Sequence, residues 1–437
     1  MIGLLDCNNF YVSCERLFDP KLLEKPVVIL SNNDGCVISR SEEAKQIGIK
    51  MGEPFFKLKK FIIDHNISVL SSNYSFYGDI SNRIMNILKK SLPIVEVYSI
   101  DEAFFILDIK NQRDDFGHKL AKKILKWTGI PVSIGLAKTK TLAKIANRVI
   151  KKKLQYPYLK IDDNSVFELR SKKIIDYVLQ KTNVNDIWGI GSKLAKFLME
   201  NGVNNAFDLR EFNESFAREK KGVILQRSIL ELKGIICNEV EKESVKKKSI
   251  CVSRSFGRKL NSYEDIRSAL IVYVQKASFK MRNYNLFCKS VTIFLKTSKY
   301  QKKKYKNIKT YFFLEGTNDV RVIWKISEKL LKEIYLSNFL YSKVGVILSD
   351  FCDSENIQKS LFYNRNRDYH KKKSDSVKLM KIMDSINKRF GDSKLRLSSD
   401  ENGSFYSKKR NAKWSMKSEY RSPCYTTNWC DIPKIKV

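Results

Sequence analysis

The chain of 437 residues predicts about three or four domains, and a hydrophobic fraction of 43% excludes disorder throughout. The net charge of +35, from 82 Lys and Arg against 47 Asp and Glu, favours a polyanionic partner over a Lys-rich composition without one. Nine scattered cysteines without a CxxC pair argue against a zinc module and against a disulfide framework. No apolar run approaches the ~20 residues that are needed to cross a bilayer. We therefore expect a cytoplasmic protein that contacts no membrane.

Strand and helix patterns alternate from the N-terminus to about residue 165, which indicates an α/β or α+β fold. The opening stretch MIGLLDCNNFYVSC has an acid and no basic region, so it predicts a short buried strand ending at Asp6 and not a signal peptide. Two strands flank the sequence SIDE closely enough to form a hairpin. The predicted strands cover residues 2–6, 25–33, 94–99, 103–108 and 130–137, and the predicted helices cover residues 79–92, 114–129 and 139–152.

Two adjacent carboxylates, Asp101 and Glu102, lie inside the apolar run of this hairpin, where acids are disfavoured and an unpaired buried charge is costly. If the first strand lies beside the hairpin, Asp6 converges with them, and convergent carboxylates hold their charge only with a cation. Oxygen ligands favour Mg²⁺, and two such ions can hold the attacking and leaving oxygens of a phosphoryl transfer. The alternative is a solvated hairpin tip with both acids in water.

The pattern becomes mainly helical from about residue 166 to 234, and it contains a turn with Gly189 and Gly191 between two predicted helices. Glycines let the backbone turn tightly and expose amide groups at a helix N-terminus, which suits a phosphate. Lys193 and Lys196 favour this helix-hairpin-helix interpretation over an ordinary turn. The charged stretch 238–249 then predicts a linker.

A second α+β unit follows the linker. Its predicted strands cover residues 249–257, 289–298 and 341–351, with a helix at 263–282. Val291, Ile293 and Leu295 alternate with Thr, Phe and Lys, so one face of that strand is expected to belong to a core.

Cationic side chains of this unit are available for a nucleic-acid backbone, although a charge run by itself more often forms a solvated face. They are Arg254, Arg258 and the lysine run 302–304. Residues 351–437 are a weaker fold candidate, with one apolar helical stripe at 376–390 that suits a core or a partner.

Five ordered motifs resemble those of Y-family DNA polymerases, and the most similar type is UmuC. The motifs are DCNNFYVSCE (6–15), VVILSNNDGCVISRSEEAKQIGIKMG (27–52), SSNYSFYGDISNRIM (71–85), YSIDEAF (98–104) and GLAKTKTLAKIAN (135–147). Because SRSFG (253–257) and SPCYTTNWCDIP (422–433) are also similar to UmuC-type chains, the resemblance covers essentially the whole chain.

The resemblance implies an α+β, multidomain, right-hand polymerase that carries out error-prone translesion DNA synthesis in the SOS response to DNA damage. The implied domains are a palm at 1–17 and 73–165, small fingers at 18–72, a helical thumb at 166–234, a linker at 235–247, an α+β little finger at 248–350 and a C-terminal region at 351–437. The segment at 33–39 would cover the nascent base pair with small residues and leave a tolerant pocket.

The resemblance also implies roles for the acids at the first strand and the hairpin. Asp6 and Asp101 would bridge two Mg²⁺ ions, Glu102 would hold the ion at the primer 3′-hydroxyl, and the carbonyl of Cys7 would add one oxygen. Tyr11 stands where the family has the aromatic ring that stacks under the sugar, where a bulky ring would exclude ribonucleotides.

The nucleotide and DNA contacts follow from the same resemblance. Lys151 falls where the family has a triphosphate-binding lysine. The fingers depart from the commoner Tyr and Arg pair, because Glu42 and Lys45 stand there, and a lysine supplies the charge of an arginine without its bidentate fork. The matching stretch of UmuC-type proteins also lacks the Tyr. The expected DNA-binding residues are Gly189, Gly191, Lys193, Arg254 and Arg258.

The expected partners are primer–template DNA, deoxynucleoside triphosphates and a sliding clamp. The sequence QKSLF resembles the clamp-binding pentapeptide, with Gln358, Leu361 and Phe362 as its contact residues. The UmuC resemblance further implies a dimeric UmuD-type protein and RecA. Two alternatives are another metal-dependent phosphoryl-transfer enzyme on a palm-like sheet and a non-catalytic DNA- or clamp-binding factor. Only the polymerase predicts template-matched, Mg²⁺-dependent primer extension.

Overall fold

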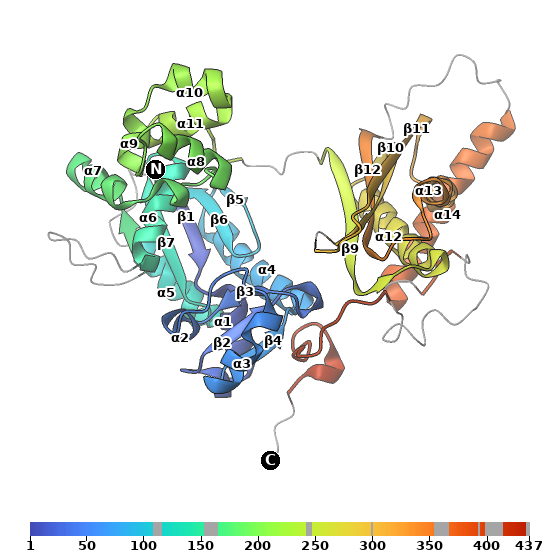
Figure 1. Ribbon diagram of the computed structural model, residues 1–437, viewed down its shortest axis with the longest axis horizontal. Helices are drawn as coiled ribbons and strands as arrows, with labels where there is room; N and C mark the ends of the chain where they lie inside the picture. Colours follow the sequence, from blue (N-terminus) through green and yellow to red (C-terminus); the bar gives the residue numbers. More distant parts are fainter. Residues whose placement is uncertain are drawn as a thin grey trace. The chain divides into compact units, whose positions relative to one another are not determined.

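The computed structural model describes residues 1–107, 116–152, 165–241, 247–298, 300–353, 367–391, 394–397 and 414–433, without the side chains of 367–374. The chain forms two compact units, of which unit 1 comprises residues 1–245 and 419–437, and unit 2 comprises residues 246–418 (Figure 1). Both units contain strands and helices, so the expected α+β multidomain class is confirmed. No helix in the described ranges is long and apolar enough to cross a membrane.

The larger sheet of unit 1 has the strand order β5-β6-β1-β7-β8. Its strands are β1 (Ile2–Cys7), β5 (Val95–Val97), β6 (Glu102–Ile106), β7 (Val132–Ala137) and β8 (Val166–Glu168). Strand β1 is antiparallel to both β6 and β7, and all of its residues are buried. The predicted first strand and the predicted hairpin around SIDE are confirmed.

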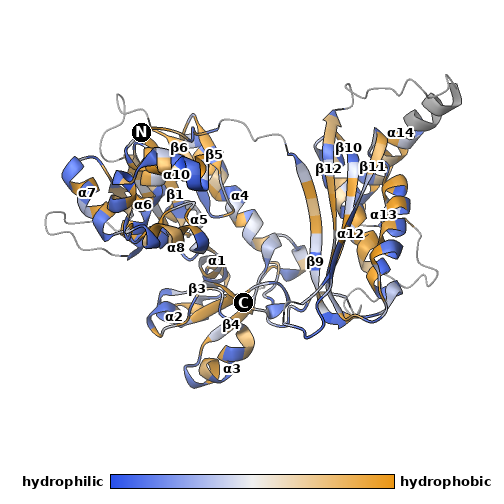
Figure 2. Ribbon diagram, turned by 45° about the horizontal axis from the view of Figure 1, so that its top comes forward, coloured by the Kyte–Doolittle hydropathy of each residue, from blue (hydrophilic) through white to orange (hydrophobic). Residues whose placement is uncertain are grey.

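Helices cover both faces of this sheet. They are α1 (Phe10–Phe18), α4 (Tyr74–Ser91), α5 (Phe116–Thr128) and α6 (Lys140–Lys152). Strand alternation turns Ile2 and Leu4 into the core that contains α6, and Leu5 into the core that contains α1, α4 and α5. Gly135 lets α6 approach β7, because a Cβ there would lie 2.3 Å from the Ala143 carbonyl oxygen. Figure 2 shows the resulting apolar strands and the mixed colouring of the helices.

A smaller sheet and a helical region complete unit 1. The smaller sheet has the order β3-β2-β4 and comprises β2 (Val27–Leu30), β3 (Val37–Arg40) and β4 (Ser68–Ser71), with α2 (Glu42–Gln46) and α3 (Phe55–Asp64). The helical region comprises α7 (Lys172–Lys181), α8 (Ser192–Glu200), α9 (Ala206–Glu211), α10 (Glu214–Lys221) and α11 (Val223–Leu232). These regions lie within the expected fingers and thumb, and we use those names below.

Unit 2 is a four-stranded sheet with the order β11-β10-β12-β9 and helices packed against its buried face. Its elements are β9 (Ser249–Leu260), α12 (Tyr263–Asn283), β10 (Leu286–Thr297), β11 (Lys306–Thr317), α13 (Val320–Ile334) and β12 (Tyr341–Asp353). Val291, Ile293 and Leu295 are fully buried, so the predicted alternation of β10 is confirmed. The sequence interpretation missed β11 and α13.

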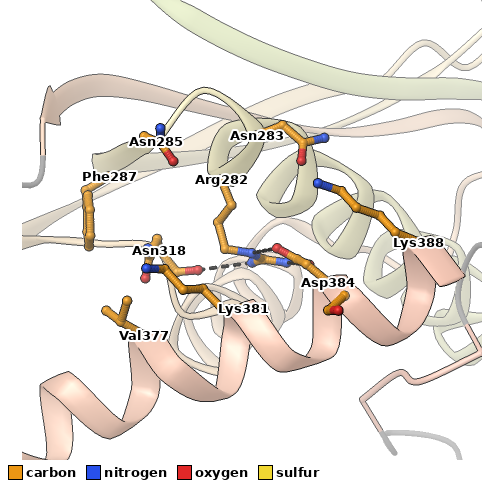
Figure 3. A pocket seen from close by; sticks show the side chains of 10 residues that line it. Arg282, Asn283, Asn285, Phe287, Asn318, Val377, Lys381, Asp384 and Lys388 are labelled. Atoms are coloured by element: carbon orange, nitrogen blue, oxygen red, sulfur yellow. Dashed lines mark hydrogen bonds and ion pairs between the residues drawn. The ribbon is translucent and has the colours of Figure 1, made fainter.

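Helix α14 (Arg367–Phe390) belongs to unit 2. Met380 and Met383 lie in the core of this unit, whereas Leu379, Ile382 and Phe390 are exposed, so only part of the predicted apolar stripe faces a core. The guanidinium of Arg282 donates two hydrogen bonds of 2.7 Å to Asp384, beside a cavity of about 710 Å³ between α12 and α14 (Figure 3). Residues 351–437, interpreted as one region from the sequence, are therefore divided, because the chain from residue 419 packs in unit 1.

Candidate active site

The first acid of the candidate site is Asp6, near the end of the central strand β1. Alternation along β1 turns Asp6 to the same side as Ile2 and Leu4, which face α6. Glu102 is its direct cross-strand partner in β6, and Ser133 is its partner in β7. Because the strand is central in the sheet, the Asp6 side chain is only 7% exposed.

The turn that carries the second acid is shaped by Ser99. Its hydroxyl donates to the Asp101 carboxylate at 2.6 Å and accepts from the N–H of Glu102 at 3.0 Å. The N–H of Cys7 donates to the Asp101 carbonyl at 2.9 Å, which joins the turn to the end of β1. Asp6, Asp101 and Glu102 thus lie at the same end of the sheet.

Lysines of α6 pair with two of these acids. Lys151 Nζ lies 2.5 Å from Asp6 Oδ1, and Lys144 Nζ donates to both carboxylate oxygens of Glu102 at 2.8 and 3.1 Å. The two lysines are seven residues apart, so they lie on one face of the helix, two turns from each other. The sequence interpretation included Lys151 but missed Lys144, although it lies in the motif AKIAN.

The pKa values of the paired acids shift in opposite directions. Burial raises the pKa of Asp6 to about 7, and the neighbouring Glu102 adds to the rise while Lys151 opposes it. Burial also acts to raise the pKa of Glu102, but the hydrogen bonds and charge of Lys144 outweigh it and lower that pKa. The Glu102 carboxylate therefore ionises readily, whereas the Asp6 carboxylate needs a nearby cation to stay ionised at neutral pH.

The donor set at this end of the sheet suits a hard cation. In the described ranges, no three His, Cys, Asp or Glu side chains are arranged so that they could hold a metal ion as they stand. Asp6 and Glu102 are instead neutralised by ammonium groups, and Asp101 is held by Ser99. Carboxylate oxygens are the ligands that Mg²⁺ prefers, so the chemistry of these side chains fits that ion.

An aromatic cluster surrounds Tyr11 on α1. Its ring stacks on Tyr77 with centroids 4.6 Å apart and meets Tyr74 edge-on at 6.0 Å. Burial, then Tyr74, then the nearby Asp101 charge raise the pKa of Tyr11 to about 12. Tyr11 therefore remains a neutral, half-buried ring close to the acidic turn.

A second aromatic cluster encloses Lys144. The Lys144 ammonium lies 4.9 Å from the ring centroid of Tyr98 and 5.6 Å from that of Trp188 in the thumb. The indole N–H of Trp188 donates to the Tyr98 hydroxyl at 3.2 Å. These contacts fix the lysine that holds Glu102 and connect the thumb to the acidic turn.

The fingers place Lys45 on α2, where it pairs with Glu42 at 2.6 Å. Asn9 Nδ2 also donates to Glu42 at 3.0 Å. Because Lys45 is partly exposed, its ammonium can exchange Glu42 for another anion.

The glycine turn of the thumb has the expected backbone. Gly189 has a φ of +87°, which favours glycine, and Gly191 is the N-cap of α8. The element before this turn is a short 3₁₀ helix, Val184–Asp186, and not the full helix that the helix-hairpin-helix interpretation expects. Lys193 is exposed in the first turn of α8.

Unit 2 presents cations on its sheet. Arg254 and Arg258 are exposed on the edge strand β9. Lys296 of β10 and Lys343 of β12 are direct cross-strand partners on the face opposite the core, a pair that the sequence interpretation missed. Burial and then the charge of Lys296 lower the pKa of Lys343, as expected where like charges gather.

The three predicted clamp-binding residues, Gln358, Leu361 and Phe362, lie outside the described residues.

Three family models match the chain. Residues 5–148 match the impB/mucB/samB family, residues 247–361 match the C-terminal domain of that family, and residues 377–435 match a domain of unknown function, DUF4113.

Relatives and solved structures agree with these matches. The chain is 38% identical to Protein UmuC of Salmonella typhimurium over the full length of both, and 33% identical to Protein MucB of Escherichia coli over 99% of both. It is 27% identical to DNA polymerase IV of Clostridium kluyveri over 94% of this chain and 99% of that one. A solved Y-family DNA polymerase chimera of Dbh and Dpo4 superposes with a TM-score of 0.65 at 24% identity, over 81% of this chain and all of that chain.

Proposed function

The chain belongs to the impB/mucB/samB family and is an error-prone translesion DNA polymerase of the Y family, and from this premise we propose which residues carry out its nucleotidyl transfer. The observation that carries the proposal is the meeting of Asp6, Asp101 and Glu102 at one end of the sheet, with lysines paired to two of them. A hairpin tip with Asp101 and Glu102 both in water does not account for a Glu102 side chain that is only 20% exposed and paired with Lys144.

Asp6, Asp101 and Glu102 would together hold two Mg²⁺ ions at this end of the sheet, and Glu102 would serve the ion that acts on the primer 3′-hydroxyl. When bound, these ions supply charge that lowers the pKa of the primer 3′-hydroxyl and neutralises the triphosphate. The backbone carbonyl of Cys7 would add an oxygen at the same end of β1. Ser99 keeps the Asp101 carboxylate oriented by its 2.6 Å hydrogen bond.

The nucleotide would contact three further side chains. Lys151 is 41% exposed, so its ammonium can move from Asp6 to an incoming triphosphate. Lys45 would supply a second cation from the fingers. Tyr11 would stack under the sugar, where its ring would clash with a ribose 2′-hydroxyl.

Primer–template DNA would be held by charge and by backbone amides. The amides at Gly189 and Gly191, with Lys193, would bind phosphates at the start of α8. Arg254 and Arg258 would add cations in unit 2. A sliding clamp bound through Gln358, Leu361 and Phe362, a UmuD-type dimer and RecA are further proposed partners, and the cytoplasm is the proposed location.

Primer extension with Mg²⁺ tests the proposal most directly. We expect the full chain to extend a primer on undamaged and abasic-site templates, with the proposed partner proteins added where extension requires them. Asp101→Ala is expected to abolish extension while DNA binding survives, because the cationic surfaces carry the affinity. Asp64→Ala, which removes an exposed acid at the end of α3, is the matched control.

Equal loss of extension and of DNA binding in Asp101→Ala would overturn the assignment of this acid. Product that does not match the template would favour another phosphoryl-transfer enzyme. Template-matched extension that persists in Asp101→Ala would place the catalytic acids elsewhere.

A further inference from the structure

The segment of residues 419–425 follows unit 2 in the chain and packs on the palm–fingers junction of unit 1. Arg421 forms a parallel bridge with Ser71 at the end of β4. The Ser71 hydroxyl and the Glu419 N–H donate to the two carboxylate oxygens of Asp34, at 2.6 and 2.9 Å. Asp34 is nearly buried, so these hydrogen bonds replace the water that its charge requires.

The start of α4 depends on the same segment. Asn73 is fully buried, and its side-chain amide donates to the hydroxyl and carbonyl of Ser422 and to the carbonyl of Pro423, at 3.1 to 3.2 Å. The guanidinium of Arg421 donates to the other end of the same amide at 3.1 Å. A fully buried amide with this set of partners indicates an integral contact and not a loosely attached terminus.

The segment also reaches helix α1 through a buried glutamate. Glu15 is 1% exposed, and its Oε1 accepts hydrogen bonds from the Tyr77 hydroxyl at 2.6 Å and from the Ser422 hydroxyl at 2.9 Å. The ring of Tyr425 stacks on Phe18 at the end of α1, with centroids 4.7 Å apart. The segment thus contacts α1 at two places, one turn of helix apart.

Tyr77 joins this network to the candidate active site. Its ring is fully buried and stacks on Tyr11 at 4.6 Å with an interplanar angle of 17°. Tyr11 and Glu15 are four residues apart on α1, so both lie on the face that meets Tyr77. A hydrogen-bonded hydroxyl fixes the depth and tilt of the Tyr77 ring, and that ring is the surface on which Tyr11 rests.

We propose that the 419–425 segment is a specificity-determining part of the active site, which positions the Tyr11 ring through Ser422, Glu15 and Tyr77 and thereby sets how strongly the enzyme rejects ribonucleotides. The inference rests on the proposed contact of Tyr11 with the sugar. It gives a role to part of the stretch that matches a domain of unknown function. Ser422, Glu15 and Tyr77 are positioning residues, because none of them would touch the nucleotide.

Two single-atom changes test the network. Ser422→Ala removes one donor to Glu15, and Tyr77→Phe removes the other while keeping the stacked ring. Each is expected to raise ribonucleotide incorporation relative to deoxynucleotide incorporation by about fivefold, the change in equilibrium that one lost hydrogen bond of typical net strength produces. Ser418→Ala, the same substitution at an exposed position, is the matched control. Ser422→Thr keeps a hydroxyl and is expected to retain the selectivity of the wild type.

The measurement is kcat/KM for each nucleotide in single-nucleotide extension by the full chain, together with hydrogen exchange of the amides of α1. A merely structural role would lower kcat for both sugars together and leave their ratio unchanged. The proposal predicts a changed ratio, faster exchange across residues 10–18 in Ser422→Ala, and no change in Ser418→Ala.

Tyr11→Ala separates the inference from its premise. If Tyr11→Ala leaves sugar selection unchanged, the proposed role of Tyr11 is wrong and the inference falls with it. If Tyr11→Ala relaxes selection while Ser422→Ala and Tyr77→Phe do not, the role of Tyr11 stands and the inference alone is wrong. Unchanged exchange of α1 in Ser422→Ala would also overturn the inference.

Discussion

Asp6 near the end of β1 and Glu102 at the start of β6 each pair with their own lysine on α6. Lys144 is the more constrained of the two lysines, since its side chain is 16% exposed and that of Lys151 is 41% exposed. The enclosed ammonium of Lys144 holds Glu102 in place, and the more exposed ammonium of Lys151 suits the triphosphate contact that we propose for it.

Lys144→Met tests the positioning of Glu102. Methionine keeps much of the side-chain length and loses the charge, so Glu102 loses both hydrogen bonds from Nζ. We expect a lower single-turnover extension rate and a loss of about 2 kcal/mol of folding free energy, as for hydrogen bonds to charged groups. Lys138→Met, at an exposed position of the same motif, is the control. An unchanged rate would show that Glu102 is held without Lys144.

Glu15→Gln should alter how stability depends on pH. Burial raises the pKa of Glu15 above its ordinary value of 4.5, so the folded state binds this proton more tightly than the unfolded state. The wild type therefore loses stability from this group as pH rises from about 4.5 through the raised pKa. Glutamine keeps the hydrogen-bond acceptor without the charge, so it lacks this loss of stability. The melting temperature of the variant minus that of the wild type should therefore increase from pH 4.5 to pH 8. A constant difference across this range would contradict the prediction.

The elements that carry the acids were predictable because local patterns define them. The apolar run that ends in Asp6 and the two strands around SIDE have signals within a few residues, and the structure contains both. Strand β11 was missed because it is a largely exposed strand at the edge of the sheet, where β10 is its one partner among the described strands. Helix α13 was missed although its apolar residues recur at helical spacing. The contacts of Lys144 with Glu102 and of Ser422 with Glu15 could not be predicted, since they join residues 42 and 407 positions apart.

The junction of α11 and α6 depends on one buried side chain, Glu231. Its carboxylate accepts from the N–H and hydroxyl of Thr141 at the start of α6, and from the N–H groups of Cys237 and Asn238 after α11. A carboxylate at a helix N-terminus also interacts favourably with the helix dipole. Glu231 thus attaches the thumb to the helix whose lysines pair with Asp6 and Glu102.

Glu231→Ala should destabilise unit 1 strongly. Several buried donors would lose their acceptor, and we expect a loss of about 3 kcal/mol or more, measured by chemical denaturation. Glu219→Ala removes an exposed glutamate of α10 and is the matched control. Equal stability of the two variants would show that water replaces the carboxylate at this junction.

At the scale of the whole molecule, the net charge is +35, and both units carry exposed cations, such as Lys193 in unit 1 and Arg254 in unit 2. Lys296 and Lys343 lie side by side on the open face of the unit 2 sheet. Two like charges in direct cross-strand pairing destabilise a sheet, which suggests that an anion offsets their repulsion during function.

Replacing Lys296 and Lys343 together with Ala should weaken DNA binding and make it less sensitive to salt. If each contacts a phosphate, the slope of log Kd against log salt should fall by about two. Fluorescence anisotropy with labelled primer–template measures this slope. Lys325 and Lys329 are exposed on α13. Replacing Lys325 and Lys329 with Ala is the control, which is expected to leave the slope unchanged. A similar fall of the slope in both double variants would mean that DNA binding depends on total charge and not on the position of Lys296 and Lys343.

Unit 1 is discontinuous in the chain, since residues 1–245 and the segment from 419 are separated by all of unit 2. During synthesis, domains generally fold in the order in which they leave the ribosome. The palm and fingers leave first, but the hydrogen bonds that Asp34, Asn73 and Glu15 make with residues 419–425 can form only after unit 2 has also been translated. A message cut short anywhere within unit 2 would therefore produce a palm with an incomplete junction, so translation through unit 2 is a precondition for a fully assembled unit 1.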